Sequence, residues 1–226
     1  MPRNRHTKAI DLAGIADPAH RDRLQAALNA CDFPLSRIYR NYGKTVPVTV
    51  SDLSRYAAVR SSEDVNHGHS HINFDGEQGH LLGEPRKGAL GLFWLPTPAA
   101  PAGRIEVGTA AFSEPHLAEE VLMAELAHAV DYGAMSKRQR DRILAAYVEG
   151  QPDADGVNDW FEEAGEDDYW AWIGESFMSG FMAAFAPSLP RPLEPRQPWV
   201  HRTTPETTAA VRKALRYRSR VPAPPA

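Results

Sequence analysis

The sequence is poor in cysteine and in long apolar runs. Its only cysteine is Cys31, which excludes an internal disulfide and a zinc site built from cysteines. Because Cys31 stands at the end of a helical pattern, we expect it to be a small buried hydrophobe. No stretch has the apolar length of a membrane-spanning helix, and residues 1–14 lack the apolar core of a secretory signal peptide. We therefore expect a cytoplasmic chain that does not enter a membrane.

A strong charge of one sign is also lacking, since the formal net charge is -4 over 226 residues. Residues 153–168 carry eight acidic residues and no basic one, which favours a solvated loop. A calcium site there stays open, although the spacing is not that of an EF-hand. After residue 186 the chain has eight Arg and Lys residues against two Glu. Because aromatic residues do not interleave with them, nucleic acid is not expected as a partner.

Charge, apolar pattern and proline content divide the chain into three parts. Residues 1–16 are basic and without a clear period, so they predict an N-terminal arm that is ordered only if something holds it. Residues 17–186 hold the apolar patterns of one domain. Residues 187–226 predict a Pro-rich, basic C-terminal arm with a short helix from Thr204 to about Arg218. The two arms could tether the domain to a partner or a larger assembly.

Periodicity predicts both helices and strands within the central part. Helices are expected from Pro18 to about Cys31 and over residues 136–147. Strands are expected over residues 46–51, 89–95 and 104–109. Residues 61–88 are polar and rich in Gly and His, and we interpret them as a loop. The pattern therefore favours an α+β domain.

The most informative stretch is a helix predicted over residues 113–133, with Ser113 as its N-cap and Gly133 at its end. Helical spacing places one histidine and one carboxylate on the apolar face, with a second carboxylate, Glu125, beside it. The residues of that face are Leu117, Val121, Ala124, His128 and Asp131. Burying such groups is costly unless they are paired, hydrogen-bonded or bound to a metal.

A second buried helix is predicted over residues 169–185, which are apolar almost all round. Glu175 is the only charged residue in that stretch. Its carboxylate needs a partner, for which His128 or a metal ion is the natural candidate. A hydrogen bond to the backbone or to a tyrosine is the alternative.

The two helices carry a family resemblance. Residues 124–128, AELAH, resemble the zincin signature HExxH, in which two histidines bind zinc and the glutamate activates water. Residues 127–131, AHAVD, are similar to the GHAVD of bacterial gluzincins like the anthrax lethal factor catalytic domain. Residues 175–181, ESFMSGF, resemble the ExFAEAF segment of the same families. The chain departs from the pattern at Ala124 and at Ser179.

The resemblance implies a zincin-like fold, in which a small mixed or antiparallel sheet packs against an active-site helix and a second buried helix. It implies that His128 and Glu175 are metal ligands and that Glu125 is the catalytic base. Asp131 would support the metal site from the second coordination shell. These roles are what the resemblance implies.

The missing histidine decides the functional expectation, because catalytic zinc normally takes three protein ligands and Ala124 supplies none. Glu120 lies about 12 Å along the helix axis from His128, too far to substitute. Alternate histidines in an extended segment, namely His67, His69 and His71, could fill the gap.

Zinc is therefore expected to bind weakly or not at all. The expected function is that of a degenerate metallopeptidase that serves in binding or assembly with a protein or peptide partner, for example as a structural component of a phage particle. Its location would then be the cytoplasm or a virion. The alternative is an active zinc endopeptidase with an altered ligand set.

Overall fold

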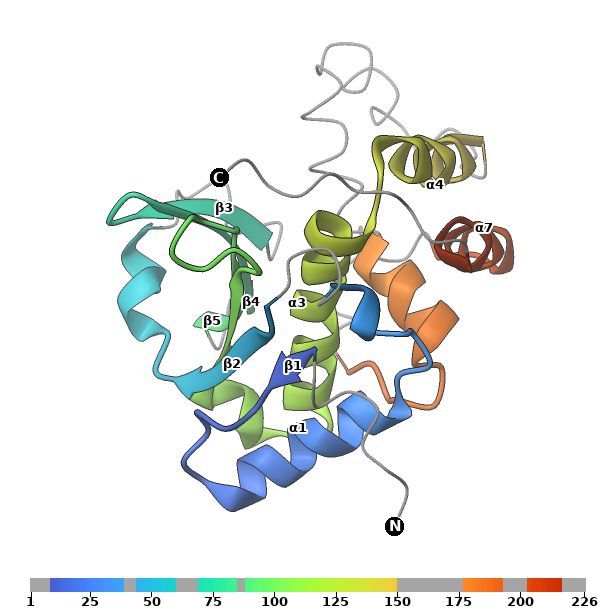
Figure 1. Ribbon diagram of the computed structural model, residues 1–226. Helices are drawn as coiled ribbons and strands as arrows, with labels where there is room; N and C mark the ends of the chain where they lie inside the picture. The colour runs from blue at the N-terminus through green and yellow to red at the C-terminus, as the bar shows by residue number, and fades with distance from the viewer. Residues whose placement is uncertain are drawn as a thin grey trace.

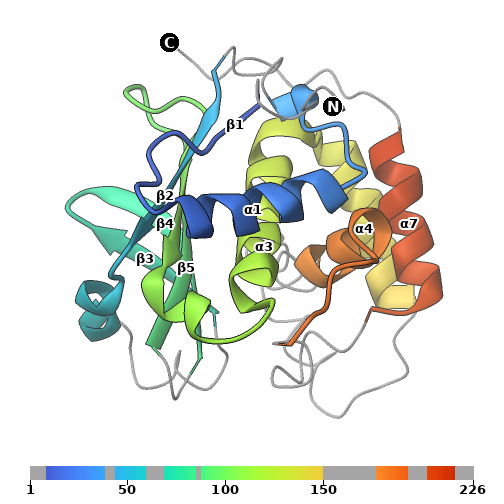
Figure 2. The same ribbon diagram turned by 90° about the horizontal axis from the view of Figure 1, so that it is seen from below.

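The computed structural model of the chain describes residues 9–38, 44–59, 69–84, 88–149, 177–192 and 203–216 (Figure 1). In this part the protein has a mixed α+β architecture. One six-stranded sheet has the strand order β1-β2-β6-β5-β4-β3, so the N-terminal strand and a hairpin form its two edges. The helices lie mainly on one side of this sheet, with α3 closest to it (Figure 2).

The sheet is parallel at one end and antiparallel at the other. Strand β2 pairs in parallel with both β1 and β6, whereas β6, β5, β4 and β3 pair in antiparallel order. The strands are β1 (Ile10–Asp11), β2 (Val46–Ser51), β3 (His69–Phe74), β4 (Glu77–Glu84), β5 (Gly88–Trp94) and β6 (Arg104–Gly108). The parallel pair β2 and β6 needs a long connection, and the chain between them supplies the β3–β4–β5 meander.

Helix α3 (Leu117–Ala134) crosses the middle of the molecule and packs against β5 and β6. Helix α1 (Pro18–Ala30) contacts α3 on another side. Residues 177–185 are also helical. The helices α4 (Lys137–Glu149) and α7 (Pro205–Arg216) pack against each other and away from the sheet (Figure 2). Two short 3-10 helices are η1 (Ser54–Val59) and η3 (Thr109–Ser113).

The main core lies between the sheet and the helices, while a smaller cluster lies on the other face of the sheet under η1. The main core includes the aromatic group Phe33, Phe177, Phe181 and Phe185, whose rings meet edge-on or tilted. Both faces of the sheet are therefore covered where β5 and β6 run. Cys31 is buried, as the sequence predicts, and burial raises the pKa of its thiol to about 11.

Most of the predicted elements are confirmed within one or two residues. Asp17 caps α1 by accepting a hydrogen bond from the Ala19 amide at 2.8 Å, and β2 has the predicted bounds. Strands β5 and β6 and helices α4 and α7 also lie where the pattern places them. In the described part of the chain, no helix has the length and apolarity that crossing a membrane would require.

The start of the helix that is expected over residues 113–133 is predicted wrongly. Helix α3 begins at Leu117, and its N-cap is His116 in the left-handed conformation, with φ 63°. The residues before it form η3, in which the Ser113 hydroxyl donates to the Ala110 carbonyl at 2.7 Å. A serine that can hydrogen-bond locally mimics a helix cap in sequence, which explains the error. The helix ends at Ala134, one residue after Gly133.

The interpretation of residues 61–88 as a loop is wrong for residues 69–84. Strands β3 and β4 form a hairpin whose turn, Asp75–Gly76, has positive φ at both residues. Asp-Gly is a strong hairpin signal, but the polar composition of the flanking strands hides it.

The predicted N-terminal arm contributes to the fold over its second half. Ile10, Leu12 and Ile15 are buried in the main core, and β1 extends the sheet beside β2. Residues 1–8 lie outside the described part.

Candidate functional site

Helix α3 is buried along most of its length, and between residues 120 and 131 its small residual exposure falls on one stripe. Glu120 and Ala124 are 5% exposed and His128 and Asp131 are 3% exposed, whereas Val121, Leu122, Met123, Leu126 and Ala127 are fully buried. The four exposed positions follow the spacing i, i+4, i+8 and i+11, so they lie along one side of the helix. Glu120, His128 and Asp131 therefore lie on the one side of α3 that keeps some exposure between residues 120 and 131.

Glu125 lies beside this stripe and points toward β5. A Cβ atom built on Gly91 of β5 would lie 2.5 Å from Glu125 Oε1 and 2.6 Å from Val121 Cγ1. The strand backbone therefore approaches the helix more closely at Gly91 than any side chain would permit. The register between β4 and β5 shifts at Leu82 and Gly83, so an extra residue of β5 falls opposite this point. Such a bulge re-aims the strand, and here it does so over the Glu125 carboxylate.

His128 lies one helical turn further along and packs against the same strand. Its ring is nearly parallel to that of Phe93, with centroids 6.3 Å apart and an interplanar angle of 13°. The ring of Tyr132, a further turn along, also packs against Phe93, with the two ring centroids 5.9 Å apart. Strand β5 thus contacts Glu125 and His128 at its alternate residues 91 and 93, so one strand positions both functional candidates.

Asp131 faces a different element. Its Oδ1 is 2.5 Å from Arg140 Nε, and a second Arg140 nitrogen donates to the Asp131 carbonyl at 3.0 Å. This pair joins the end of α3 to the first turns of α4, and the Arg140 guanidinium also lies over the Tyr132 ring. Asp131 therefore has a structural partner, Arg140. Its expected role in the second coordination shell of a metal stays a prediction.

The other predicted ligands are only partly placed. Glu175 and His67 lie outside the described residues, and of His69 and His71 only the backbone, in β3, is described. Ser179, which stands where the family has a glutamate, is 3% exposed within the helical residues 177–185. Among the described residues, no group of three or more His, Cys, Asp or Glu side chains is arranged to hold a metal ion.

A further buried carboxylate that was not predicted from the sequence, that of Glu106, lies on the opposite face of the sheet. Glu106 is 6% exposed and accepts hydrogen bonds from Trp94 Nε1 at 2.7 Å, Ser51 Oγ at 2.8 Å and Arg55 at 3.2 Å. Its signal is visible in the strand pattern, because Glu106 stands between the apolar Ile105 and Val107. Alternation places it on the other side of the sheet from those two residues.

Glu119 is also missed, and it joins the start of α3 to α1. Its carboxylate accepts two hydrogen bonds from Arg23, at 2.6 Å and 2.9 Å. Burial raises the pKa of Glu119, but the hydrogen bond and charge of Arg23 outweigh burial, so the pKa is lowered overall. Together with Asp131 and Arg140, this pair fixes both ends of the helix that carries Glu125 and His128.

Comparisons of the chain with protein-family models, with curated proteins and with solved structures find no match. The functional argument therefore depends on the residues of this chain and on their geometry.

Proposed function

We propose that the chain is a degenerate zincin, a metallopeptidase-like scaffold that serves in binding or assembly. The observation that carries this proposal is the pair Glu125 and His128. Both are nearly fully buried on a central helix, three residues apart, and both contact one strand, β5. Ionisable groups are rarely placed so deep in an apolar core for stability alone, because their burial is costly.

The donor set around this pair fits a catalytic metal only in part. Position 124 is on the same stripe as His128 and one turn before it, but alanine offers no donor atom. His128 and one carboxylate would give two protein ligands, where catalytic zinc takes three. We therefore propose that zinc binds weakly or not at all and that the partner is a protein or peptide.

An active endopeptidase is the competing proposal, with a histidine of residues 67–71 as the third ligand. The sheet topology disfavours two of the three candidates. His69 and His71 belong to β3, which is separated from β5 by β4, and two strand spacings amount to about 10 Å. His67 lies outside the described residues, so this alternative depends on that position.

The test is a zinc titration by calorimetry of untagged wild type and of Ala124→His. The new imidazole would lie one helical turn before His128, so we expect weak binding in wild type and binding tighter by roughly a hundredfold or more in the variant. Ala124→Gln matches the added bulk without a good zinc ligand, and Ala124→His/His128→Ala removes the original histidine. Both controls should bind no better than wild type.

Two results would overturn the proposal. Tight binding by wild type, lost in His128→Ala, would show a complete site and favour the endopeptidase. If folded Ala124→His binds no better than Ala124→Gln, then residues 124 and 128 do not face a metal position, and the zincin interpretation fails. Circular dichroism of each variant shows whether the fold is intact.

A further inference from the structure

Helices α4 and α7 pack in antiparallel orientation, and this brings two distant basic segments together. The Gln139 side chain, near the start of α4, donates to the Ala214 carbonyl near the end of α7 at 2.7 Å. At the other end, Tyr147 near the end of α4 lies beside Thr207 near the start of α7. The first half of α4 therefore lies beside the second half of α7.

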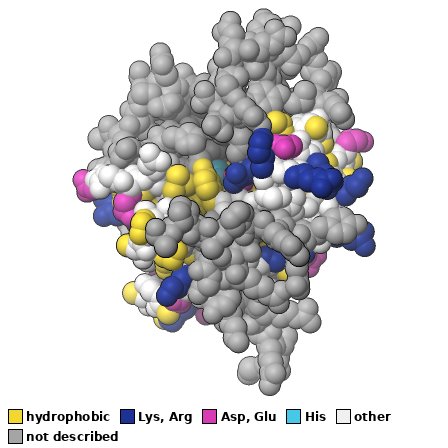
Figure 3. All heavy atoms as spheres, turned by 45° about the horizontal axis from the view of Figure 1, so that its top comes forward, with side chains coloured by type: hydrophobic (Ala, Val, Ile, Leu, Met, Phe, Trp, Pro, Cys, Tyr) yellow, Lys and Arg dark blue, Asp and Glu magenta, His cyan; other side chains and the backbone are white. Residues whose placement is uncertain are grey.

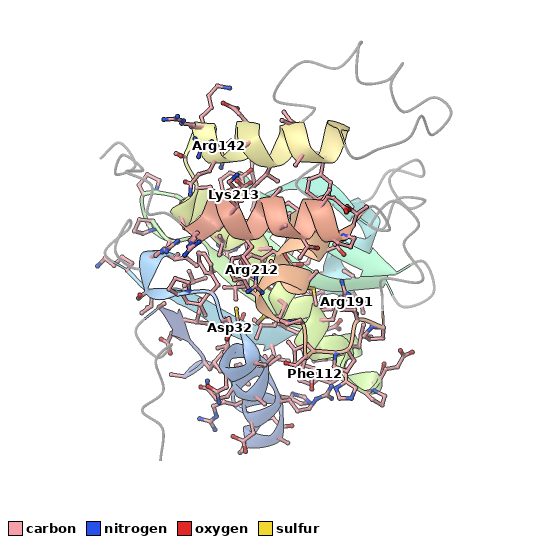
Figure 4. All side chains as sticks on the ribbon, turned by 90° about the vertical axis from the view of Figure 1, so that its right-hand side faces the viewer. Asp32, Phe112, Arg142, Arg191, Arg212 and Lys213 are labelled. Atoms are coloured by element: carbon pink, nitrogen blue, oxygen red, sulfur yellow. The ribbon has the colours of Figure 1, made fainter. Side chains whose placement is uncertain are left out.

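The basic residues of both helices are concentrated at this shared end. We define the basic face as Arg138, Arg142, Arg212, Lys213 and Arg216, all of which are exposed. Figure 4 shows Arg142 on α4 and Arg212 and Lys213 on α7, and Figure 3 shows Lys and Arg side chains gathered on this side of the molecule. In sequence the residues of α4 and those of α7 are at least 70 positions apart, so the face is created by helix packing.

Acidic residues do not neutralise this face within the described part of α4 and α7. The exposed Asp141 is paired with Lys137 at 3.3 Å, and Glu206 lies at the opposite end of α7. The Arg212 guanidinium itself donates to the Ala184 carbonyl and lies over the Phe185 ring, so this charge is held in a fixed position, and its remaining N–H groups are the ones that could bind a phosphate. Arg37 donates to the carbonyls of Leu215 and Arg216 and holds the end of α7 in place. The charges are thus carried by a fixed helix pair.

We propose that the basic face binds the phosphate backbone of double-stranded nucleic acid. Four of its five residues are arginines, whose guanidinium groups bind phosphate oxygens in a bidentate manner. The exposed positions described on α4 and α7 include no aromatic or branched aliphatic residue. Tryptophan and tyrosine anchor many protein interfaces, and aromatic residues form the stacking platform for single strands. A duplex backbone requires neither of them.

The chain as a whole does not reveal this partner, because its net charge is negative. Its residues 153–168 contain eight acidic residues, and subtracting their charge from the net charge of -4 leaves +4 for the remainder. The negative sum therefore reflects one acidic segment, and it does not argue against a local site for a polyanion. Backbone binding of this kind carries no sequence specificity.

The test uses fluorescence anisotropy of a labelled 20-base-pair duplex of arbitrary sequence, titrated with the full chain over a series of salt concentrations. With four or five phosphate contacts, the plot of log K against log salt should have a slope of about -4. Arg142→Gln/Lys213→Gln should reduce that slope by about 2 and weaken binding at least tenfold at low salt.

The matched control is Arg21→Gln/Lys44→Gln, which also removes one arginine and one lysine, from α1 and from the exposed residue 44 before β2. We expect its affinity to stay within about twofold of wild type. The proposal is overturned if both double variants weaken binding equally, since net charge would then explain the effect. It is also overturned if wild type shows no salt-dependent binding, or if polyglutamate competes for the face better than the duplex does, which would indicate an acidic protein partner.

Discussion

The two faces of the sheet each bury a carboxylate, and they treat it differently. On the η1 side, Glu106 is enclosed by three hydrogen-bond donors. Arg104 Nε is also near, at 3.7 Å from Glu106 Oε1. On the α3 side, Glu125 lies against the backbone of Gly91, and its helix neighbour His128 packs on the Phe93 ring. The donors around Glu106 indicate a structural role, and the glycine and strand bulge beside Glu125 indicate that the backbone of β5 is shaped to admit this carboxylate.

The largest effect should come from removing the enclosed carboxylate. We expect Glu106→Ala to lower the free energy of unfolding by about 3 kcal/mol, because it leaves the Trp94 indole N–H and the charge of Arg55 without their acceptor. Urea denaturation measures this value. Glu77→Ala is the matched control, since Glu77 binds Arg104 in the same cluster but is 37% exposed at its side chain. Its loss should cost less than about 1 kcal/mol.

If the two variants cost the same, burial does not distinguish these carboxylates. The enclosed carboxylate would then not be the stabilising member of its cluster, and the contrast between the two faces would be lost.

The next effect tests the close approach on the α3 side. Gly91→Ala places a methyl group where Glu125 Oε1 and Val121 Cγ1 already lie, and overpacking of this kind costs about 2 kcal/mol. Gly14→Ala is the control, because its new Cβ would meet Thr49 Cγ2 at an ordinary 3.6 Å. In a double-mutant cycle, Glu125→Ala should relieve at least about 0.5 kcal/mol of the cost. Additive changes would show that Gly91 does not position Glu125.

Much of the fold could be predicted from sequence, because amphipathic periods and caps are local signals. Asp17 before Pro18 and the β-branched run of β2 are examples. The hairpin β3–β4 could not be predicted from hydrophobic alternation, since its strands are rich in polar residues and only the Asp75–Gly76 turn gives a signal. Composition alone places domain boundaries at residues 17 and 187, whereas the burial of Ile15 and the packing of α7 on α4 depend on tertiary contacts.

The ionisable residues of the candidate site can be predicted from the sequence, but the elements that pack against them cannot. Helical spacing alone places Glu125 and His128 one turn apart on α3. It cannot show that β5 covers both of them, because Gly91 and Phe93 reach that position only through the sheet register and its bulge. Nor can it show that Asp131 is held by Arg140, since the angle between α3 and α4 depends on packing that no local signal encodes.

The smallest effect is also the sharpest test, because it makes the same substitution on both faces. Glu125→Gln keeps the shape that fits against Gly91 and removes a charge whose burial is costly, so we expect the free energy of unfolding to change by less than about 1 kcal/mol. Glu106→Gln should cost about 2 kcal/mol, because its bonds to Arg55 and Trp94 lose the assistance of a negative charge. Denaturation of both variants under one condition gives the difference directly. A cost for Glu125→Gln equal to that for Glu106→Gln would make both carboxylates structural. A small cost accompanied by loss of the biological role would instead favour catalysis, since a pseudopeptidase that keeps its fold has no use for that particular proton acceptor.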